Sequence, residues 1–466
     1  MTYRRPLRAA GLFLALLLAP SPAPGQSTES ASPVTTAEEL VRVARGHEKD
    51  RRFDEALQTW FRVLSLDRGN SEARDAIPRA VRNALQAHRH RDPAFLARVL
   101  AMSQADVMAL YAEVLAKIQG HYVDPDKAAT TRLFRQGLDE YLAALADPSF
   151  VSQHVRGTDE ATLAKFRDNL RKAWANRDVA TTREAVEVVA RIGNESKKLL
   201  GLRTYNPVVC EFICGACNCL DEYSAYLSAG QYLAESAGSP QPSVHVRPVE
   251  GGVVYMQITH FQPSTPQEVE NALKNLTMMG NVRALILDLR GNTGGLFPAA
   301  VKTAEKFLPG GIIVTALGPN DDANKVYTST AGNAATDLPM VVLVDGETAS
   351  AAEVLAIALR DNQRAKLVGT ATFGKGTVQK VVAFTTAEDV DPESGKRQPR
   401  AAVRITLARL IGPSGNPITG VGVTPDQLVP DRAQQFDAAL EQAKDLARRY
   451  MGGMGMMNGM GMRMGD

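Results

Sequence analysis

The sequence predicts an all-helical region followed by a layered α/β core. Between residues 36 and 230, apolar side chains recur at three- and four-residue spacing, which is typical of amphipathic helices. After residue 252, short apolar runs alternate with helical segments, which indicates a mostly parallel sheet covered by helices. The chain has 466 residues, of which 44% are hydrophobic, so it can bury a sizeable core. The formal net charge of +2 gives no reason to expect a nucleic-acid partner.

Residues 1–25 are predicted to be a signal peptide. Three arginines precede the apolar run Gly11–Ala19, which is too short to span a bilayer, and small residues precede a cut after Gly25. The pair Arg4-Arg5 leaves a twin-arginine signal open, and an uncleaved anchor is the other alternative. We therefore expect an exported chain, periplasmic or secreted, with no stable membrane span after signal cleavage.

A tetratricopeptide-like helical region is predicted for residues 36–90, after a Ser/Pro/Thr linker over residues 26–35. The stretch Arg52–Ala73, with a short turn before it at Lys49–Arg52, resembles one tetratricopeptide repeat. A single repeat buries its own apolar face poorly. The region is therefore expected to stack on the helices that follow, to self-associate, or to dock a partner.

The remaining domains are a helical region over residues 91–235, a linker over 236–251, a core over 252–450 and a tail over 451–466. Helices of the first are expected at Val107–Ile118, Thr131–Ala144, Thr162–Ala175 and Thr182–Ile192. Strands of the core are expected at Gly252–His260, Ala284–Leu289, Gly311–Leu317, Pro339–Val344, Ala365–Val368, Thr377–Phe384 and Ala401–Ala408. Its helices are expected at Pro266–Met279, Ala299–Phe307, Ala351–Arg360 and Gln434–Tyr450.

The tail holds seven of the fourteen methionines, spaced by glycine. Thioethers suit Cu(I), but a Gly-rich segment has little to pack against, so a disordered tail is the prediction. No metal and no cofactor are expected.

Four cysteines, Cys210, Cys214, Cys217 and Cys219, fall within ten residues. Export favours one or two local disulfides. Free buried thiols in a helix of small residues, or a metal site, are the alternatives. Catalytic thiol chemistry is not expected, because no histidine lies nearby in the sequence.

A candidate serine nucleophile lies where a buried strand turns into a helix, at Ser350. Ser350-x-x-Glu353 is also a capping box, which starts many ordinary helices. A serine nucleophile needs a base, and no histidine follows His260. Lys375 lies between two glycines, and burial would lower its pKa enough for it to take the serine proton. Gln379 could hold the lysine amine in place.

Two glycine-rich segments have alternative interpretations. Gly369–Lys375 spells G-x-x-x-x-G-K, but Gly376 stands where a phosphate-binding loop needs Ser or Thr, and a strand-like run follows. Leu287–Gly295 is a strand that enters a Gly-rich turn, where exposed N–H groups could form half of an oxyanion hole. Taken alone, the second segment fits a plain strand-to-helix turn better than an oxyanion hole.

Taken together, these segments resemble the C-terminal processing peptidases, also called tail-specific proteases, which are serine peptidases with a Ser–Lys dyad. The resemblance lies in Leu285–Gly295 (LILDLRGNTGG), Val342–Glu353 (VLVDGETASAAE), Thr372–Gln379 (TFGKGTVQ) and Arg404–Asp426. Upstream, Leu220–Leu227 and Ile118–Pro125 are also similar to the family.

The resemblance implies a role for each matching residue. Ser350 would be the nucleophile, Lys375 the general base and Gln379 the residue that orients the lysine. The backbone amides of Gly295 and Ala351 would form the oxyanion hole. It also implies a spiral α/β core similar to crotonase and Clp protease. The expected function is that of an exported serine-type endopeptidase that cuts protein or peptide substrates through an acyl-enzyme, with C-terminal processing as one form of that activity.

One departure from the family concerns a PDZ domain, which members usually carry before the first core strand. Here Ser228–Gly251 spans only 24 residues, too few for that domain, so C-terminal selectivity is open. Asp361 falls where some members have a further acid, although a structural role at a helix end is simpler. The alternative function is a catalytically silent peptide-binding or scaffold protein with a degenerate protease domain. A crotonase-like acyl-CoA enzyme is disfavoured by export.

Overall fold

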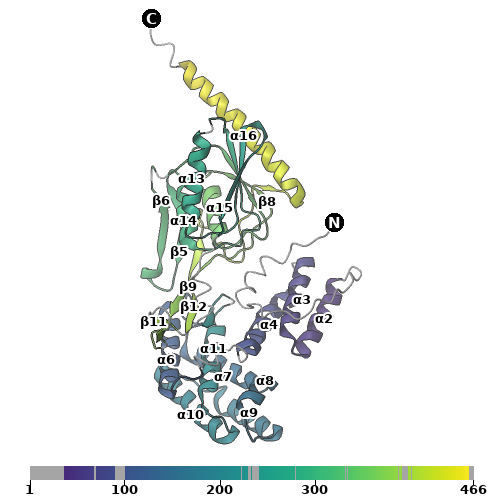
Figure 1. Cartoon of the computed structure of the whole chain (residues 1–466), viewed down its shortest axis with the longest axis vertical. Helices are drawn as coiled ribbons and strands as arrows, with labels where there is room; N and C mark the ends of the chain where they lie inside the picture. The colour runs from purple at the N-terminus through teal and green to yellow at the C-terminus, as the bar shows by residue number, and fades with distance from the viewer. Residues whose placement is uncertain are drawn as a thin grey trace. The chain divides into compact units, whose positions relative to one another are not determined.

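The computed structural model forms two compact units (Figure 1). The helical unit comprises the chain up to Ser236 together with Gln379–Thr406, and the sheet unit comprises Ala237–Val378 together with Leu407–Asp466. The structure describes residues 36–67, 70–89, 100–221, 223–228, 232, 241–278, 280–330, 332, 334–386, 388–390, 397–399 and 401–460. The predicted signal peptide and the first linker lie outside the described residues.

Three helices begin the helical unit: α2 (Ala37–Lys49), α3 (Phe53–Leu66) and α4 (Ser71–Arg89). Thr36 and Glu39 start α2 as a capping box, in which each side chain accepts a hydrogen bond from the other residue's backbone N–H. The small core between these helices centres on Trp60 of α3. The helix pair expected on either side of the Lys49–Arg52 turn is therefore present, and α4 covers it as a third helix.

Six further helices follow: α6 (Gln104–His121), α7 (Thr130–Ala144), α8 (Pro148–His154), α9 (Glu160–Trp174), α10 (Thr182–Leu200) and α11 (Asn206–Asn218). All four predicted helices are confirmed, while α8 and α11 were not among them. The sequence interpretation treated Pro148 as an end signal, but it opens α8 behind the N-cap Asp147. Helices α7 and α11 meet at glycines, since a Cβ on Gly215 would lie 2.6 Å from the Cα atom of Gly137.

All four cysteines are free thiols, so the favoured prediction of local disulfides is wrong. Cys210, Cys214 and Cys217 lie buried along α11, where neighbours about one helical turn apart do not bridge. Burial raises the pKa of the Cys217 thiol to about 12, so it stays protonated at neutral pH. The alternative of free buried thiols in a helix of small residues is the correct one.

The helical unit also contains short strands: β1 (Ala225–Ser228), most of β9 (Thr377–Ala383), β10 (Glu388–Val390), β11 (Arg397–Pro399) and the first part of β12 (Ala401–Ile411). Strand β1 pairs with β12 in antiparallel orientation. Val403 and Ile405 of β12 join the same core as the helices. The predicted core over residues 252–450 is therefore interrupted, because Gln379–Thr406 folds with the helical unit.

The sheet unit is built on six strands in the order β13-β8-β7-β4-β3-β2. These are β2 (Val244–Pro248), β3 (Val253–Ile258), β4 (Ala284–Asp288), β7 (Met340–Val344), β8 (Lys366–Gly369) and β13 (Gln427–Leu428). All neighbouring pairs are parallel except β2 with β3. Two further strands, β5 (Gly311–Leu317) and β6 (Lys325–Ser329), form an antiparallel pair, and the end of β12 joins β5.

Helices cover both faces of this sheet. On one face lie α13 (Thr265–Met278), α14 (Phe297–Glu305) and α15 (Ala351–Asp361), and on the other lies α16 (Arg432–Met460). Each face of the sheet has its own apolar core, and alternate residues of β4 point into opposite cores. Leu285 and Leu287 face α13, α14 and α15, and Ala284 and Ile286 face α16. Two short 3₁₀ turns, η1 (Glu250–Gly252) and η2 (Asp321–Ala323), complete the unit. The predicted α/β layering after an all-helical region is confirmed.

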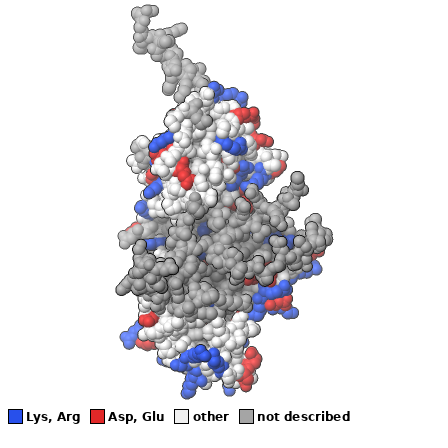
Figure 2. Space-filling model, viewed as in Figure 1, with Lys and Arg blue, Asp and Glu red and all other residues white. Residues whose placement is uncertain are grey.

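Two details of the sheet unit correct the prediction. The linker expected over residues 236–251 contains β2, an edge strand whose exposed residues left no apolar run to detect. Helix α16 runs to Met460, ten residues past its expected end, so the first part of the supposedly disordered tail is helical. Methionine is a good helix former, and the sequence interpretation gave more weight to the glycines. On the face drawn in Figure 2, basic and acidic side chains are interspersed, in keeping with the near-neutral charge.

Candidate active site

Three loops leave neighbouring parallel strands at the same edge of the sheet. We call them the glycine loop (residues 289–296, after β4), the serine turn (345–350, after β7) and the lysine loop (370–376, after β8). The Ala349 N–H donates to the Asn292 carbonyl at 2.9 Å, and the Phe373 N–H donates to the Thr348 carbonyl at 3.0 Å. The carboxyl ends of adjacent parallel strands are the usual place for a site in a sheet of this kind. The three sequence motifs are thus joined by their own backbones.

Ser350 adopts a strained backbone conformation. Its φ of 57° and ψ of −119° are rare for a residue with a side chain, and α15 starts at the next residue. A serine on a sharp turn of this kind, between a strand and a helix, has its hydroxyl held out from the backbone. The side chain is half-buried. Ser350 is thus the N-cap of α15, with Glu353 as its capping-box partner, and it also has the strained backbone that a nucleophile on such a turn adopts.

Glu353 links the backbones of the two predicted dyad residues. Its Oε2 accepts hydrogen bonds from the N–H groups of Ser350 and Lys375, each at 2.8 Å. Its Oε1 accepts from the Gly374 N–H at 2.7 Å and from the Thr372 hydroxyl at 2.5 Å. Burial raises the pKa of Glu353 above its ordinary value, although these four donors oppose the shift. The sequence analysis gave this residue only a capping role.

Lys375 is half-buried, whereas the sequence analysis expected a buried lysine. The loop around it packs closely against residues 418–422. The Gly420 N–H donates to the Gly374 carbonyl at 2.8 Å, and a Cβ on Gly376 would lie 2.4 Å from the Thr419 nitrogen. The two glycines that flank the lysine are therefore required by packing, and they fix where its side chain starts.

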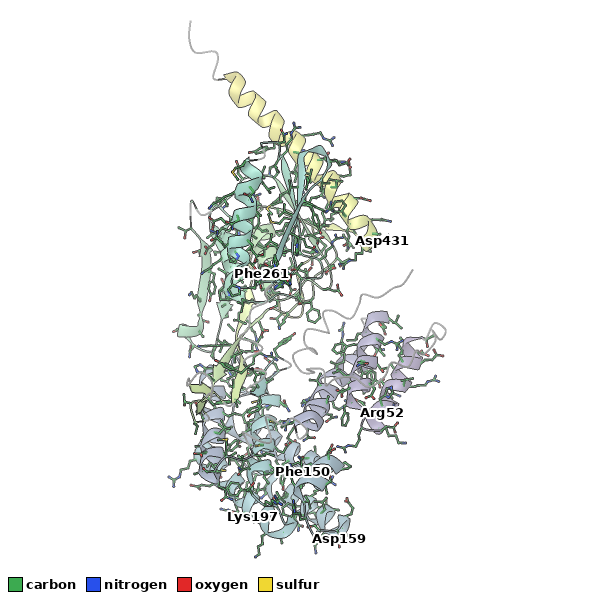
Figure 3. All side chains as sticks on the ribbon, viewed as in Figure 1. Arg52, Phe150, Asp159, Lys197, Phe261 and Asp431 are labelled. Carbon is green, nitrogen blue, oxygen red and sulfur yellow. The ribbon has the colours of Figure 1, made fainter. Side chains whose placement is uncertain are left out.

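The glycine loop lies directly against Ser350. A Cβ on Gly294 would be 2.9 Å from the Ser350 Cβ and 3.0 Å from the Ala351 nitrogen. Phe261, labelled in Figure 3, donates its N–H to the Gly294 carbonyl and accepts from the Leu296 N–H, both at 2.8 Å. These two bonds flank Gly295 and fix the backbone on either side of it. Its φ of 130° suits only glycine.

Ala351 is the first residue of α15, so its N–H has no partner within the helix. The Gly295 and Ala351 amides were predicted as a pair, and the structure places their loops in contact. Asn292 shapes the glycine loop from within, because its side chain is buried, donates to the Ile258 carbonyl and accepts from the Gly294 N–H. Sequence reasoning missed Asn292; a polar residue inside a Gly-rich turn after a buried strand was the available signal.

The other sequence candidates lie elsewhere. Gln379 belongs to the helical unit and donates to the Thr406 hydroxyl at 3.3 Å, so its role toward Lys375 stays a prediction. His260 follows β3, and its Nδ1 lies 3.0 Å from the Thr259 hydroxyl oxygen. Asp361 accepts from the N–H and hydroxyl of Ser414, the structural role expected for a helix end.

The described residues contain neither a candidate metal site nor a candidate membrane-spanning helix. No group of three or more His, Cys, Asp or Glu side chains there could hold a metal ion. None of the helices described has the length and apolar content needed to cross a bilayer.

Comparison with known proteins finds similarity in one continuous segment, most of which lies in the sheet unit. Residues 252–429 match the model of peptidase family S41. A carboxyl-terminal-processing protease of Synechocystis is 38% identical over 177 residues, which cover 38% of this chain and 38% of that protein. A carboxy-terminal-processing protease of Bartonella bacilliformis is 32% identical over 203 residues, which cover 42% of this chain and 44% of that protein. Residues 252–429 are therefore similar to the peptidases of family S41, and the curated relatives that match are named as carboxyl-terminal-processing proteases.

The alignments span less than half the length of these curated relatives. Among solved structures, a photosystem II D1 C-terminal processing protease matches with a TM-score of 0.40 and 20% identity, over 71% of this chain and 94% of that one. A TM-score this low supports no inference beyond the sequence match.

Proposed function

We propose that this chain is an exported serine-type endopeptidase that hydrolyses peptide bonds of protein substrates with a Ser350–Lys375 dyad. The observation that carries the proposal is the Glu353 carboxylate, which binds the backbone N–H groups of both residues at 2.8 Å. A helix cap would need only the first of these bonds. The second ties the backbone of Lys375 to the carboxylate that also binds the backbone of the strained Ser350, which supports pairing a serine with a nearby base.

In the proposed reaction, the Ser350 hydroxyl oxygen attacks the substrate carbonyl carbon while the neutral Lys375 amine takes the hydroxyl proton. The negative charge on the substrate oxygen is stabilised by the N–H groups of Gly295 and Ala351. The peptide C–N bond breaks as the lysine ammonium returns the proton to the leaving nitrogen. Water then attacks the acyl-enzyme, with the same amine as its base, and releases Ser350.

Other parts of the proposal rest on the sequence and on the relatives. Export rests on the predicted signal peptide over residues 1–25. C-terminal processing rests on the names of the relatives, and the short segment before β3 leaves its selectivity to experiment. Protein or peptide substrates follow from the S41 match, and docking of a partner on helices α2–α4 rests on the repeat-like pattern alone.

The test is digestion of an unstructured protein by the mature chain, with product termini identified by mass spectrometry. Ser350→Ala and Lys375→Ala are expected to abolish cleavage. Two variants of exposed residues serve as matched controls: Ser152→Ala on α8 and Lys302→Ala on α14 should cut as the parent does. The positions of the new termini show whether cleavage is confined to C-terminal tails.

A parent that is inert over several substrates and pH values would contradict the proposal. It would favour the alternative, a silent peptide-binding or scaffold protein, which a pull-down with the Ser350→Ala variant would then address. Turnover that survives Ser350→Ala would contradict the dyad itself.

A further inference from the structure

Asp345 joins the glycine loop to the serine turn. Its Oδ1 accepts from the Gly291 N–H at 3.0 Å, the Glu347 N–H at 3.0 Å and the Thr348 N–H at 3.1 Å. The first donor belongs to the loop that carries Gly295, and the others belong to the turn that carries Ser350. The carboxylate is buried, so its charge needs a partner nearby.

Helix α16 supplies that partner. Arg432, its first residue, forms an ion pair with Asp345 Oδ2 and lies 3.6 Å from a Glu347 carboxylate oxygen. The N-cap region of α16 is marked by Asp431 in Figure 3. No motif of the sequence analysis included Arg432, because it lies far along the chain from the serine turn.

A second contact ties the same helical turn to the glycine loop. Arg290 holds Asp288 through two nitrogens, the closest approach being 2.6 Å, and donates to the Arg432 carbonyl and the Gln435 side-chain oxygen. Further along, apolar residues of α16 pack on the sheet, among them Leu440 and Ala443. Arg432 therefore lies at the start of a helix that is itself packed on the sheet.

We propose that Arg432 is a positioning residue for acyl transfer, which holds the glycine loop and the serine turn at a fixed separation through Asp345. This inference rests on the proposed function. An oxyanion hole stabilises charge only when its donors lie within hydrogen-bond distance of the developing oxyanion. The two proposed donors, the Gly295 and Ala351 N–H groups, follow different strands, so the separation of the glycine loop and the serine turn sets the distance between them. Without Arg432, Asp345 would lose the ion pair on Oδ2 that fixes its carboxylate, its three backbone hydrogen bonds on Oδ1 would weaken, and the two loops would shift apart.

The experiment compares Arg432→Ala and Arg432→Lys with the parent, using cleavage kinetics and hydrogen exchange. We expect Arg432→Ala to lower kcat about tenfold with KM within twofold, since a misplacement of about 1 Å can cost up to about 100-fold in rate. Arg432→Lys should recover most of kcat. Arg448→Ala, on an exposed ion pair of the same helix, is the matched control and should behave as the parent.

A double-mutant cycle separates positioning from general loss of stability. Asp345→Asn keeps an oxygen for the backbone donors but removes the charge, so Arg432→Ala should add little in that background. An Arg432→Ala enzyme with parental kcat, or an undiminished effect in the Asp345→Asn background, would overturn the proposal.

Hydrogen exchange keeps the inference testable if the parent does not cut. The amides of Gly291 and Thr348 should exchange faster in Arg432→Ala than in the parent and in Arg448→Ala. Unchanged exchange would overturn the positioning role, whereas an inert parent with faster exchange in the variant would count against the proposed function alone.

Discussion

The helical unit and the sheet unit both bury charged side chains, but those charges bind different partners. In the helical unit, Arg89 of α4 reaches Glu211 of α11 at 2.9 Å and Glu140 of α7 at 3.5 Å, so side chains pair with side chains. In the sheet unit, the carboxylates of Glu353 and Asp345 bind mainly backbone N–H groups.

The difference follows from what each backbone lacks. Residues in a helix interior have their N–H and C=O groups paired within the helix, so buried charges between helices must satisfy each other. Loops at a strand end leave N–H groups without such partners, and a buried carboxylate can take several at once. Buried charges in the helical unit therefore join one helix to another, while those in the sheet unit fix the conformation of the loops at the strand ends.

The strongest test of this comparison is Glu353→Gln. A glutamine amide has only one accepting oxygen. It therefore cannot accept hydrogen bonds from both the Ser350 N–H and the Thr372 hydroxyl, which bind different oxygens of the carboxylate. We expect kcat to fall about 100-fold or more, as when an oxyanion-hole donor is lost. Glu195→Gln, on an exposed position of α10, is the control. Calorimetry should show a folded variant; parental kcat would show that Glu353 does not set the geometry of the dyad.

The corresponding test in the helical unit is Arg89→Met. It leaves two buried carboxylates without their cation, which costs about 3–5 kcal/mol in the free energy of unfolding. Both tryptophans of the chain, Trp60 and Trp174, are buried in this unit, so urea unfolding followed by tryptophan fluorescence reports on it selectively.

Arg183→Met is the matched control, because Arg183 pairs with Glu187 on the surface of α10 and should contribute under about 1 kcal/mol. If Arg89→Met were no more destabilising than this control, the buried cluster would not join α4 to the other helices.

The sequence predicted what depends on local pattern. Strands such as β4 and β7 are short apolar runs, α15 follows an apolar helical period, and Ser350 and Lys375 lie in recognisable motifs. Edge strands such as β2 carry no apolar run, because most of their residues face solvent.

Long-range pairings were beyond local reasoning. The Glu353 carboxylate accepts a hydrogen bond from the lysine loop, and the Arg432 guanidinium forms an ion pair with the serine turn. Both contacts form only because parallel strands bring these segments to one edge of the sheet. The free thiols of α11 depended on helix geometry at a segment whose helical character had been left open. Local sequence pattern was enough to predict the candidate nucleophile and base, but only the tertiary structure shows that Glu353 and Arg432 contact their loops.

The smallest effect we predict concerns the pH dependence of the buried charges. Glu140 has an Asn218 amide at 3.3 Å and Arg89 at 3.5 Å, and it shares that cation with Glu211. Burial is the main cause that raises the pKa of Glu140 above its ordinary value, and Glu211 adds to it. A carboxyl whose pKa is higher in the folded state stabilises the fold below its ordinary pKa. That contribution is lost as pH rises through the folded value.

Glu140→Gln resembles the protonated form at every pH and keeps the oxygen that faces Asn218. Relative to the parent, its free energy of unfolding should therefore rise between pH 4 and pH 7, because the variant does not lose the contribution that the parent loses as Glu140 ionises. Urea titrations with tryptophan fluorescence at the two pH values measure the difference, and Glu195→Gln supplies the baseline. If the difference in free energy of unfolding between variant and parent stays constant or falls with pH, the Arg89 cation keeps both carboxylates ionised. The helical unit would then accommodate buried charge as well as the loops of the sheet unit do.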